Sequence, residues 1–115
     1  MANSVLLHTA RDLKKASLQH DAPLWARLAE YLLKPSSARR NINIKRLGQL
    51  TKADDTVVFP GKVLGTGSIP HRITLYSFSI SASALSKIKE AGGTAIAHDV
   101  LISQNPTGKG VILLG

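Results

Sequence analysis

The stretch KPSSARRNINIKRLGQLTKADDTVVFPGKVLGTG, from Lys34 to Gly67, decides how the rest of the sequence is interpreted. Its first part, residues 34–52, carries no acidic residue and six basic ones: Lys34, Arg39, Arg40, Lys45, Arg46 and Lys52. Its second part, residues 56–67, is a β-branched run, a Pro-Gly dipeptide, a further apolar run and a Gly-rich end. This pattern predicts a basic arm that leads into a small folded body, and such an arm indicates an anionic partner.

Basic residues are concentrated in the first half of the chain. The 115 residues include 15 Lys and Arg against seven Asp and Glu, which gives a formal net charge of +8. Residues 1–52 hold ten basic and three acidic residues, whereas residues 53–115 hold five and four. The asymmetry favours a polyanion, because bound phosphates relieve the repulsion between the cations. Composition leaves open the alternative of a basic globular protein with no nucleic-acid role.

Length and composition also narrow the class of protein. The length predicts one domain over residues 1–115, with a helical N-terminal part (1–35), a basic arm (36–52) and an αβ body (53–115). The absence of cysteine excludes a disulfide framework and a thiolate metal site. No apolar run approaches the roughly 18–20 residues of a membrane span, so we expect a cytoplasmic protein with no membrane partner.

Helical periodicity marks the N-terminal part. Residues 4–18 repeat apolar side chains at helical spacing, and Ser4 is the expected N-cap. Pro23 is expected to open a second helix, because the first helical position tolerates its missing N–H, and Pro35 to end it. Trp25 lies within the apolar stripe of the second helix, so we expect it to pack between helices rather than stack on a base.

Short apolar runs mark the remainder of the chain. The predicted strands are residues 42–44, 56–59, 62–64, 73–80, 94–97 and 111–114, and Pro60-Gly61 is expected to turn the chain between the second and third of these. The predicted helical segments are residues 47–50, 81–91 after a Ser81 cap, and 98–104. The expected fold class is α/β, with N-terminal helices followed by short strands interleaved with small helices.

Residues that could carry chemistry do not form a recognisable active site. His8, His20, His71 and His98 are scattered, and no HExxH, GxSxG or P-loop string occurs. The adjacent Asp54 and Asp55 favour a turn, since no base or metal ligand is spaced around them. We therefore expect no catalytic residue, metal, cofactor or small-molecule substrate. A small enzyme that uses Lys62 or His71 beside the Gly-rich bend remains a separate hypothesis.

The arm carries the strongest electrostatic signal. Arg39-Arg40 and Lys45-Arg46 can bracket successive phosphates, because guanidinium groups bind phosphate through two parallel hydrogen bonds. The side chains of Asn41 and Asn43 can add further hydrogen bonds. Aromatic residues do not flank the arm, so base stacking is expected to be secondary to recognition of backbone and shape, as for structured RNA. The same composition would also fit an architectural DNA-binding protein, which is the alternative to an RNA-binding one.

Two strings resemble the L eighteen-e family of large-subunit ribosomal proteins, which is related to the bacterial L fifteen family. The first is KPSSARRNINIKRL at residues 34–47, and the second is VVFPGKVLGTG at residues 57–67. The compact length is similar to that of the archaeal branch. The resemblance implies a non-enzymatic protein of the ribosome whose partners are large-subunit ribosomal RNA and neighbouring ribosomal proteins. It also implies an irregular β-β-α layered C-terminal body, which agrees with the order of strands and helices predicted above.

The resemblance also implies which residues face the RNA. By matched position these are Lys34, Arg39, Arg40, Asn43, Lys45, Arg46, Lys62 and Gly65. We add His71 and Arg72, which follow Pro70, to these candidates on electrostatic grounds.

Overall fold

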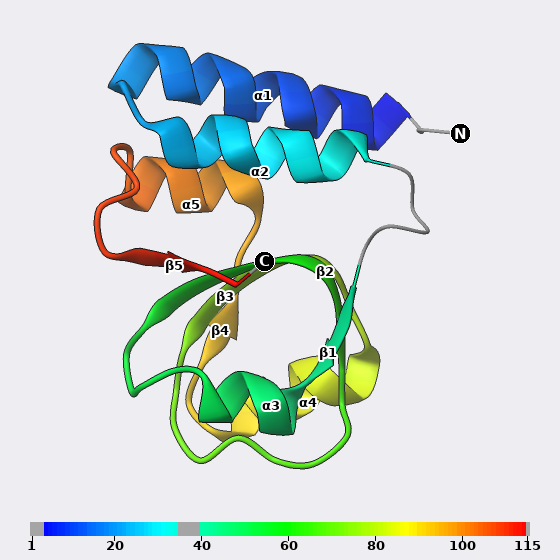
Figure 1. Ribbon diagram of the computed structural model, residues 1–115. Helices are drawn as coiled ribbons and strands as arrows, with labels where there is room; N and C mark the ends of the chain where they lie inside the picture. The colour runs from blue at the N-terminus through cyan, green and yellow to red at the C-terminus, as the bar shows by residue number, and fades with distance from the viewer. Residues whose placement is uncertain (1–3, 35–39, 115) are drawn as a thin grey trace. The chain divides into compact units, whose positions relative to one another are not determined.

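The computed structural model describes residues 4–34 and 40–114 of the chain (Figure 1). Pro35 and Arg39, which carried two of the predictions, lie outside the described residues. The elements are α1 (Ser4–His20), α2 (Pro23–Leu33), β1 (Asn41–Asn43), α3 (Ile44–Gln49), β2 (Thr56–Leu64), β3 (Thr74–Ile80), α4 (Ala82–Glu90), β4 (Thr94–Ala95), α5 (His98–Gln104) and β5 (Val111–Leu113). The order of helices and strands confirms the predicted α/β class, and most boundaries lie within two residues of those expected.

Contacts divide the chain into two compact units. The helical unit contains the described residues 4–34 and 97–109, so it combines α1 and α2 with α5. The sheet unit contains residues 40–96 and 110–114, and it holds all five strands together with α3 and α4. Within the part of the chain that the structure describes, no helix combines the length and the apolar character needed to cross a membrane.

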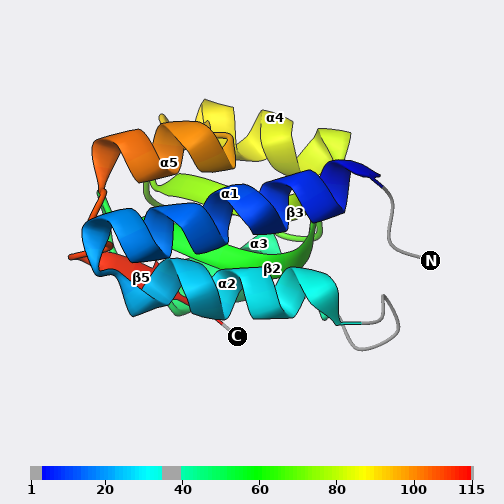
Figure 2. The same ribbon diagram turned by 90° about the horizontal axis from the view of Figure 1, so that it is seen from above.

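Large apolar side chains form the interior of the helical unit. α1 contacts both α2 and α5, and these helices lie side by side (Figure 2). Leu13, Trp25 and Leu28 are fully buried. The indole Nε1 of Trp25 donates a hydrogen bond of 2.7 Å to the carbonyl oxygen of Pro106, in the loop after α5. Trp25 is therefore a packing residue, as predicted, and it joins segments 81 residues apart.

A hydrogen bond between a histidine and a carboxylate also joins α5 to α1. The imidazole Nε2 of His98 lies 3.0 Å from a carboxylate oxygen of Asp12, and the Nε2 of His8 lies 3.7 Å from the same oxygen. The hydrogen bond with His98 lowers the pKa of the Asp12 carboxyl, and the positive charge of Lys15 acts in the same direction.

All pairings in the sheet unit are parallel, and β2 is the central strand (Figure 1). One edge of β2 pairs with β3, which in turn pairs with β4. The other edge of β2 pairs with two short strands: β5 lies along residues 56–58 and β1 lies along residues 62–64. The helices α3 and α4 contribute to the same apolar cluster as the sheet, which is made of Ile44, Leu47, Val57, Phe59, Val63, Ile69, Ile73, Leu75, Ala84 and Ile88.

The predicted turn at Pro60-Gly61 is wrong. β2 runs without interruption from Thr56 to Leu64, and its register against β3 shifts between Phe59 and Lys62, which is a β-bulge. A bulge leaves a residue outside the ladder, so the missing N–H of Pro60 breaks no pair there. Gly61 is needed because a β-carbon at this position would overlap the carbonyl oxygen of Arg40.

Candidate nucleic-acid interface

The basic arm enters the sheet unit as β1 and continues directly into α3. Asn43 is the N-cap of α3, and its side-chain oxygen accepts a hydrogen bond of 2.8 Å from the backbone N–H of Arg46. This cap fixes the start of the helix. Lys45 and Arg46, both exposed, therefore project from a defined first turn of α3 rather than from a loose loop.

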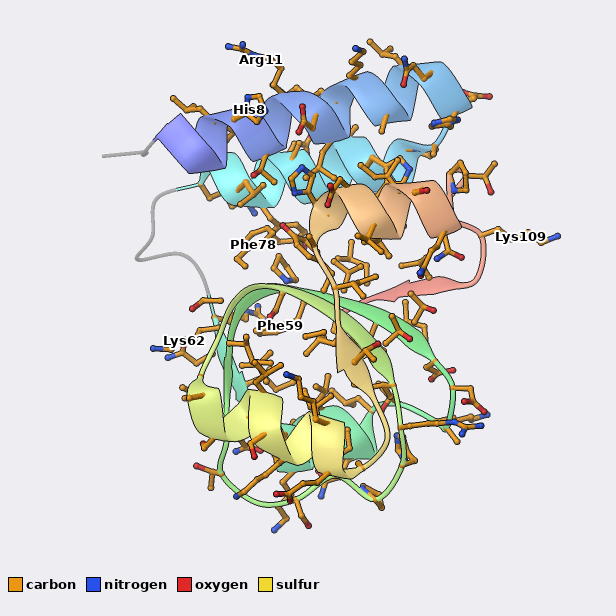
Figure 3. The ribbon with its side chains drawn as sticks, turned by 180° about the vertical axis from the view of Figure 1, so that it is seen from behind. His8, Arg11, Phe59, Lys62, Phe78 and Lys109 are labelled. Carbon is orange, nitrogen blue, oxygen red and sulfur yellow. The ribbon has the colours of Figure 1, made fainter. Side chains whose placement is uncertain are left out.

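Strand pairing brings Lys62 to the arm. Lys62 pairs with Asn41 in the parallel ladder between β1 and β2, and its backbone N–H donates to the carbonyl oxygen of Arg40 at 3.1 Å. The Lys62 side chain is exposed and extends away from the ribbon (Figure 3). Residues 40–46 and Lys62 thus share one edge of the sheet unit, although they are far apart in sequence.

The Gly-rich loop after β2 lies against both helices of the sheet unit. The backbone N–H of Lys45 donates to the carbonyl oxygen of Thr66 at 3.4 Å, which places α3 beside the loop. A β-carbon at Gly65 would overlap the hydroxyl oxygen of Ser83, in the first turn of α4. Gly65, a candidate RNA contact, therefore also has a packing role that no other residue type fits.

The candidate cations differ in their partners. Among residues 4–34 and 40–114, Lys45, Arg46 and Lys62 form no ion pair with a carboxylate, and the Nη1 of Arg46 lies 3.5 Å from the side-chain oxygen of Gln49. Lys34 belongs to the helical unit, where its ammonium lies 4.6 Å from the centre of the Tyr31 ring. We call Lys45, Arg46 and Lys62 the cationic edge: these exposed cations lie on α3 and on the part of β2 that pairs with β1.

Comparison with known proteins identifies the family. A sequence model of the family described as ribosomal proteins 50S-L15 and 50S-L18e, together with a 60S member, matches residues 23–96, which is more than half of the chain. The chain belongs to this family. The matched region contains every candidate RNA-facing residue, and the resemblance noted in the sequence is confirmed. Members of the family are structural constituents of the ribosome, so the chain is not an enzyme, as predicted.

Relatives from archaea cover most of the chain. A protein of Archaeoglobus fulgidus named large ribosomal subunit protein eL18 is 39% identical over 102 residues, which are 89% of this chain and 87% of the relative. The proteins of that name from Methanothermobacter thermautotrophicus and Pyrobaculum aerophilum are 34% identical over 112 residues and 37% identical over 109. These alignments cover 97% and 95% of this chain and 93% and 89% of the relatives. The match to archaeal members agrees with the compact length.

Like Asn43, the candidates His71 and Arg72 have side-chain partners within the sheet unit. The Nε of Arg72 donates to a carboxylate oxygen of Asp54, and the pair lowers the pKa of Asp54 and raises that of Arg72. The Nε2 of His71 lies 2.8 Å from the hydroxyl oxygen of Thr51, which donates to the carbonyl oxygen of Leu47. An RNA contact at His71 or Arg72 stays a prediction, and it would have to compete with these partners.

The sequence reasoning missed the positioning role of Lys87. Its ammonium donates to the carbonyl oxygens of Gly65 and Gly67, at 2.7 and 2.9 Å, and thereby holds the Gly-rich loop against α4. The sequence offered one signal: carbonyl groups in a tight bend need donors, and a helix with lysines in its last turn follows this bend. From its charge alone, Lys87 would have been predicted to face solvent or to contact RNA.

Proposed function

We propose that the chain is a structural constituent of the large ribosomal subunit that binds large-subunit ribosomal RNA through its sheet unit. One observation carries the proposal: the cationic edge places three exposed positive charges, without carboxylate partners among the described residues, on a rigid junction of β1, α3 and β2. Family membership and relatives named large ribosomal subunit protein eL18 support the ribosome as the place of action, and hence a cytoplasmic protein.

The geometry supports phosphate recognition. The guanidinium of Arg46 can bind a phosphate through two hydrogen bonds, whereas the ammonium groups of Lys45 and Lys62 act as point charges. Each phosphate contact releases condensed counterions, which favours binding. The N-cap at Asn43 and the close contact at Gly61 fix the backbone beforehand, so less conformational entropy is lost when RNA binds. Arg40, just before β1, adds a further positive charge beside Lys62. The helical unit is left to contact neighbouring ribosomal proteins.

A salt titration tests this proposal. The double variant Lys45→Gln with Lys62→Gln removes two phosphate contacts, so the slope of log affinity against log salt should fall by about two units for structured large-subunit ribosomal RNA. Lys109→Gln is the matched control, since Lys109 is exposed on a loop of the helical unit and points outward (Figure 3). Its effect on the slope should be below about one unit, the change expected for a single phosphate contact. Neither variant should change the unfolding temperature appreciably.

Two outcomes would overturn the proposal. An unchanged salt slope in the double variant would show that the cationic edge does not contact phosphates. Equal affinity for duplex DNA and for structured RNA at matched salt would favour the alternative of an architectural DNA-binding protein.

A further inference from the structure

A groove of about 450 Å³ opens in the sheet unit beside the arm. Its lining combines two arginines, Arg40 and Arg46, with apolar side chains from four separate segments: Ile42 in β1, Leu50 after α3, Phe59 in β2 and Leu113 in β5. Its size is within the range of pockets that hold one small ligand. No pattern in the sequence indicates this groove, because residues from 40 to 113 meet only in the folded sheet.

The groove lies where β2 lacks a neighbour on one edge. β5 pairs with residues 56–58 and β1 pairs with residues 62–64, so residues 59–61 are the part of this edge that neither strand covers. Leu50 is 42% exposed, whereas its neighbour Leu47 is fully buried. Phe59 is only 4% exposed, so the apolar surface that the groove presents to solvent is chiefly Leu50, with the half-buried Ile42 and Leu113 beside it.

The chemistry of this lining is that of a nucleotide site. An apolar floor favours the face of an unstacked base, and guanidinium groups on the rim favour the phosphates on either side of it. We infer that the groove receives a single unstacked nucleotide of the bound RNA, with its base on Leu50 and its phosphates beside Arg40 and Arg46. The inference rests on the proposed function, because it names the RNA feature that the sheet unit would recognise.

A peptide fits this groove less well than a nucleotide. An added β-strand would have only residues 59–61 to pair with, and Pro60 offers no N–H donor. Two arginines on the rim would further restrict a peptide to an acidic one. A nucleotide needs no ladder of backbone hydrogen bonds, and it brings the negative charge that the rim complements.

Competition between two RNA probes tests the inference. The probes are an RNA hairpin with one unpaired adenosine in its stem and the same hairpin fully paired. The full chain should bind the bulged hairpin about tenfold more tightly, a preference at the low end of what stacking of one base on an aromatic side chain gives. Leu50→Glu places a negative charge on the floor and should bring this ratio close to one. Leu18→Glu, at a leucine on α1 that is 86% exposed, makes the same charge change and should preserve the ratio.

The possible outcomes separate the two proposals. If the wild-type chain binds both hairpins equally, or if Leu50→Glu keeps the preference, the groove does not receive a base, while the proposed function stands. Failure to bind either hairpin or ribosomal RNA would overturn both.

A benzophenone amino acid in place of Leu50 should form an adduct with RNA in isolated large subunits. An adduct with a neighbouring protein alone would assign the groove to a peptide and contradict the inference.

Discussion

The two units of the molecule are stabilised in different ways. The helical unit depends on large buried side chains such as Trp25 and Leu28, which fill the space between helices. The sheet unit has an apolar core as well, but close approaches of backbone at Gly61 and Gly65 shape the edge where the cations lie. Substitutions in the helical unit should therefore reduce stability chiefly by leaving cavities, whereas small additions in the sheet unit should disturb the candidate interface itself.

The largest expected effect is on Trp25. Trp25→Ala removes a fully buried indole and its hydrogen bond to Pro106, and it should lower the free energy of unfolding by about 3–5 kcal/mol. Chemical denaturation measures this loss. Trp25→Phe, which retains most of the volume, is the control and should lose less. If the alanine variant changed RNA affinity while it remained folded, the separation of roles between the units would be wrong.

Gly65→Ala tests the close approach in the sheet unit. Its β-carbon would overlap the Ser83 hydroxyl, so the variant should lose about 1–3 kcal/mol of stability and also bind RNA more weakly. Adding Ser83→Ala removes the overlapping oxygen and should restore part of both losses. Denaturation and RNA affinity of the single and double variants check this coupling. Strictly additive losses would mean that Ser83 is not what excludes a side chain at Gly65.

Lys87→Met should have a smaller effect. It removes two hydrogen bonds to the carbonyls of Gly65 and Gly67, and the cost should be about 1 kcal/mol because water can partly replace the ammonium. Lys89→Met, at an exposed lysine of the same helix, is the control and should leave the unfolding temperature unchanged. Hydrogen exchange of the backbone at residues 65–67 should be faster in the Lys87 variant alone. Equal exchange rates in both variants would contradict a positioning role.

The smallest expected effect concerns acid stability of the helical unit. Because the hydrogen bond with His98 lowers the pKa of Asp12, the ionised carboxylate stabilises the fold above its ordinary pKa of 3.8. This contribution disappears as the pH falls from 3.8 through the lowered value. Asp12→Asn should therefore unfold at a lower temperature than the wild type near neutral pH and at the same temperature in strong acid. His8→Ala, which removes only the longer contact, should behave almost like the wild type.

Local sequence patterns were sufficient to predict most of the helices and strands. The helices around Trp25 and after Ser81 follow from periodicity and capping, which depend on neighbouring residues alone. The Pro60-Gly61 dipeptide was misassigned because it suits a turn and a bulge equally, and the choice is made by the distant carbonyl of Arg40. The inclusion of α5 in the helical unit likewise depends on long-range contacts such as the one between Trp25 and Pro106.

The candidate site was predictable in charge but not in arrangement. Clustered lysines and arginines identified the arm, yet only the ladder between β1 and β2 brings Lys62 to it. The intramolecular partners of Asn43, His71 and Arg72 also depend on the fold. Sequence therefore indicates where positive charge is abundant, and the structure distinguishes the cations with carboxylate partners from those of the cationic edge.

Sedimentation with ribosomes tests the central claim most directly, namely that the cationic edge holds the chain on ribosomal RNA. The tagged chain and its triple variant Lys45→Gln, Arg46→Gln, Lys62→Gln are sedimented with archaeal large subunits through increasing salt. The wild type should stay in the large-subunit fraction at salt concentrations that release the variant, because the variant has lost phosphate contacts. Release of both at the same salt concentration, with the variant fully folded, would contradict the account.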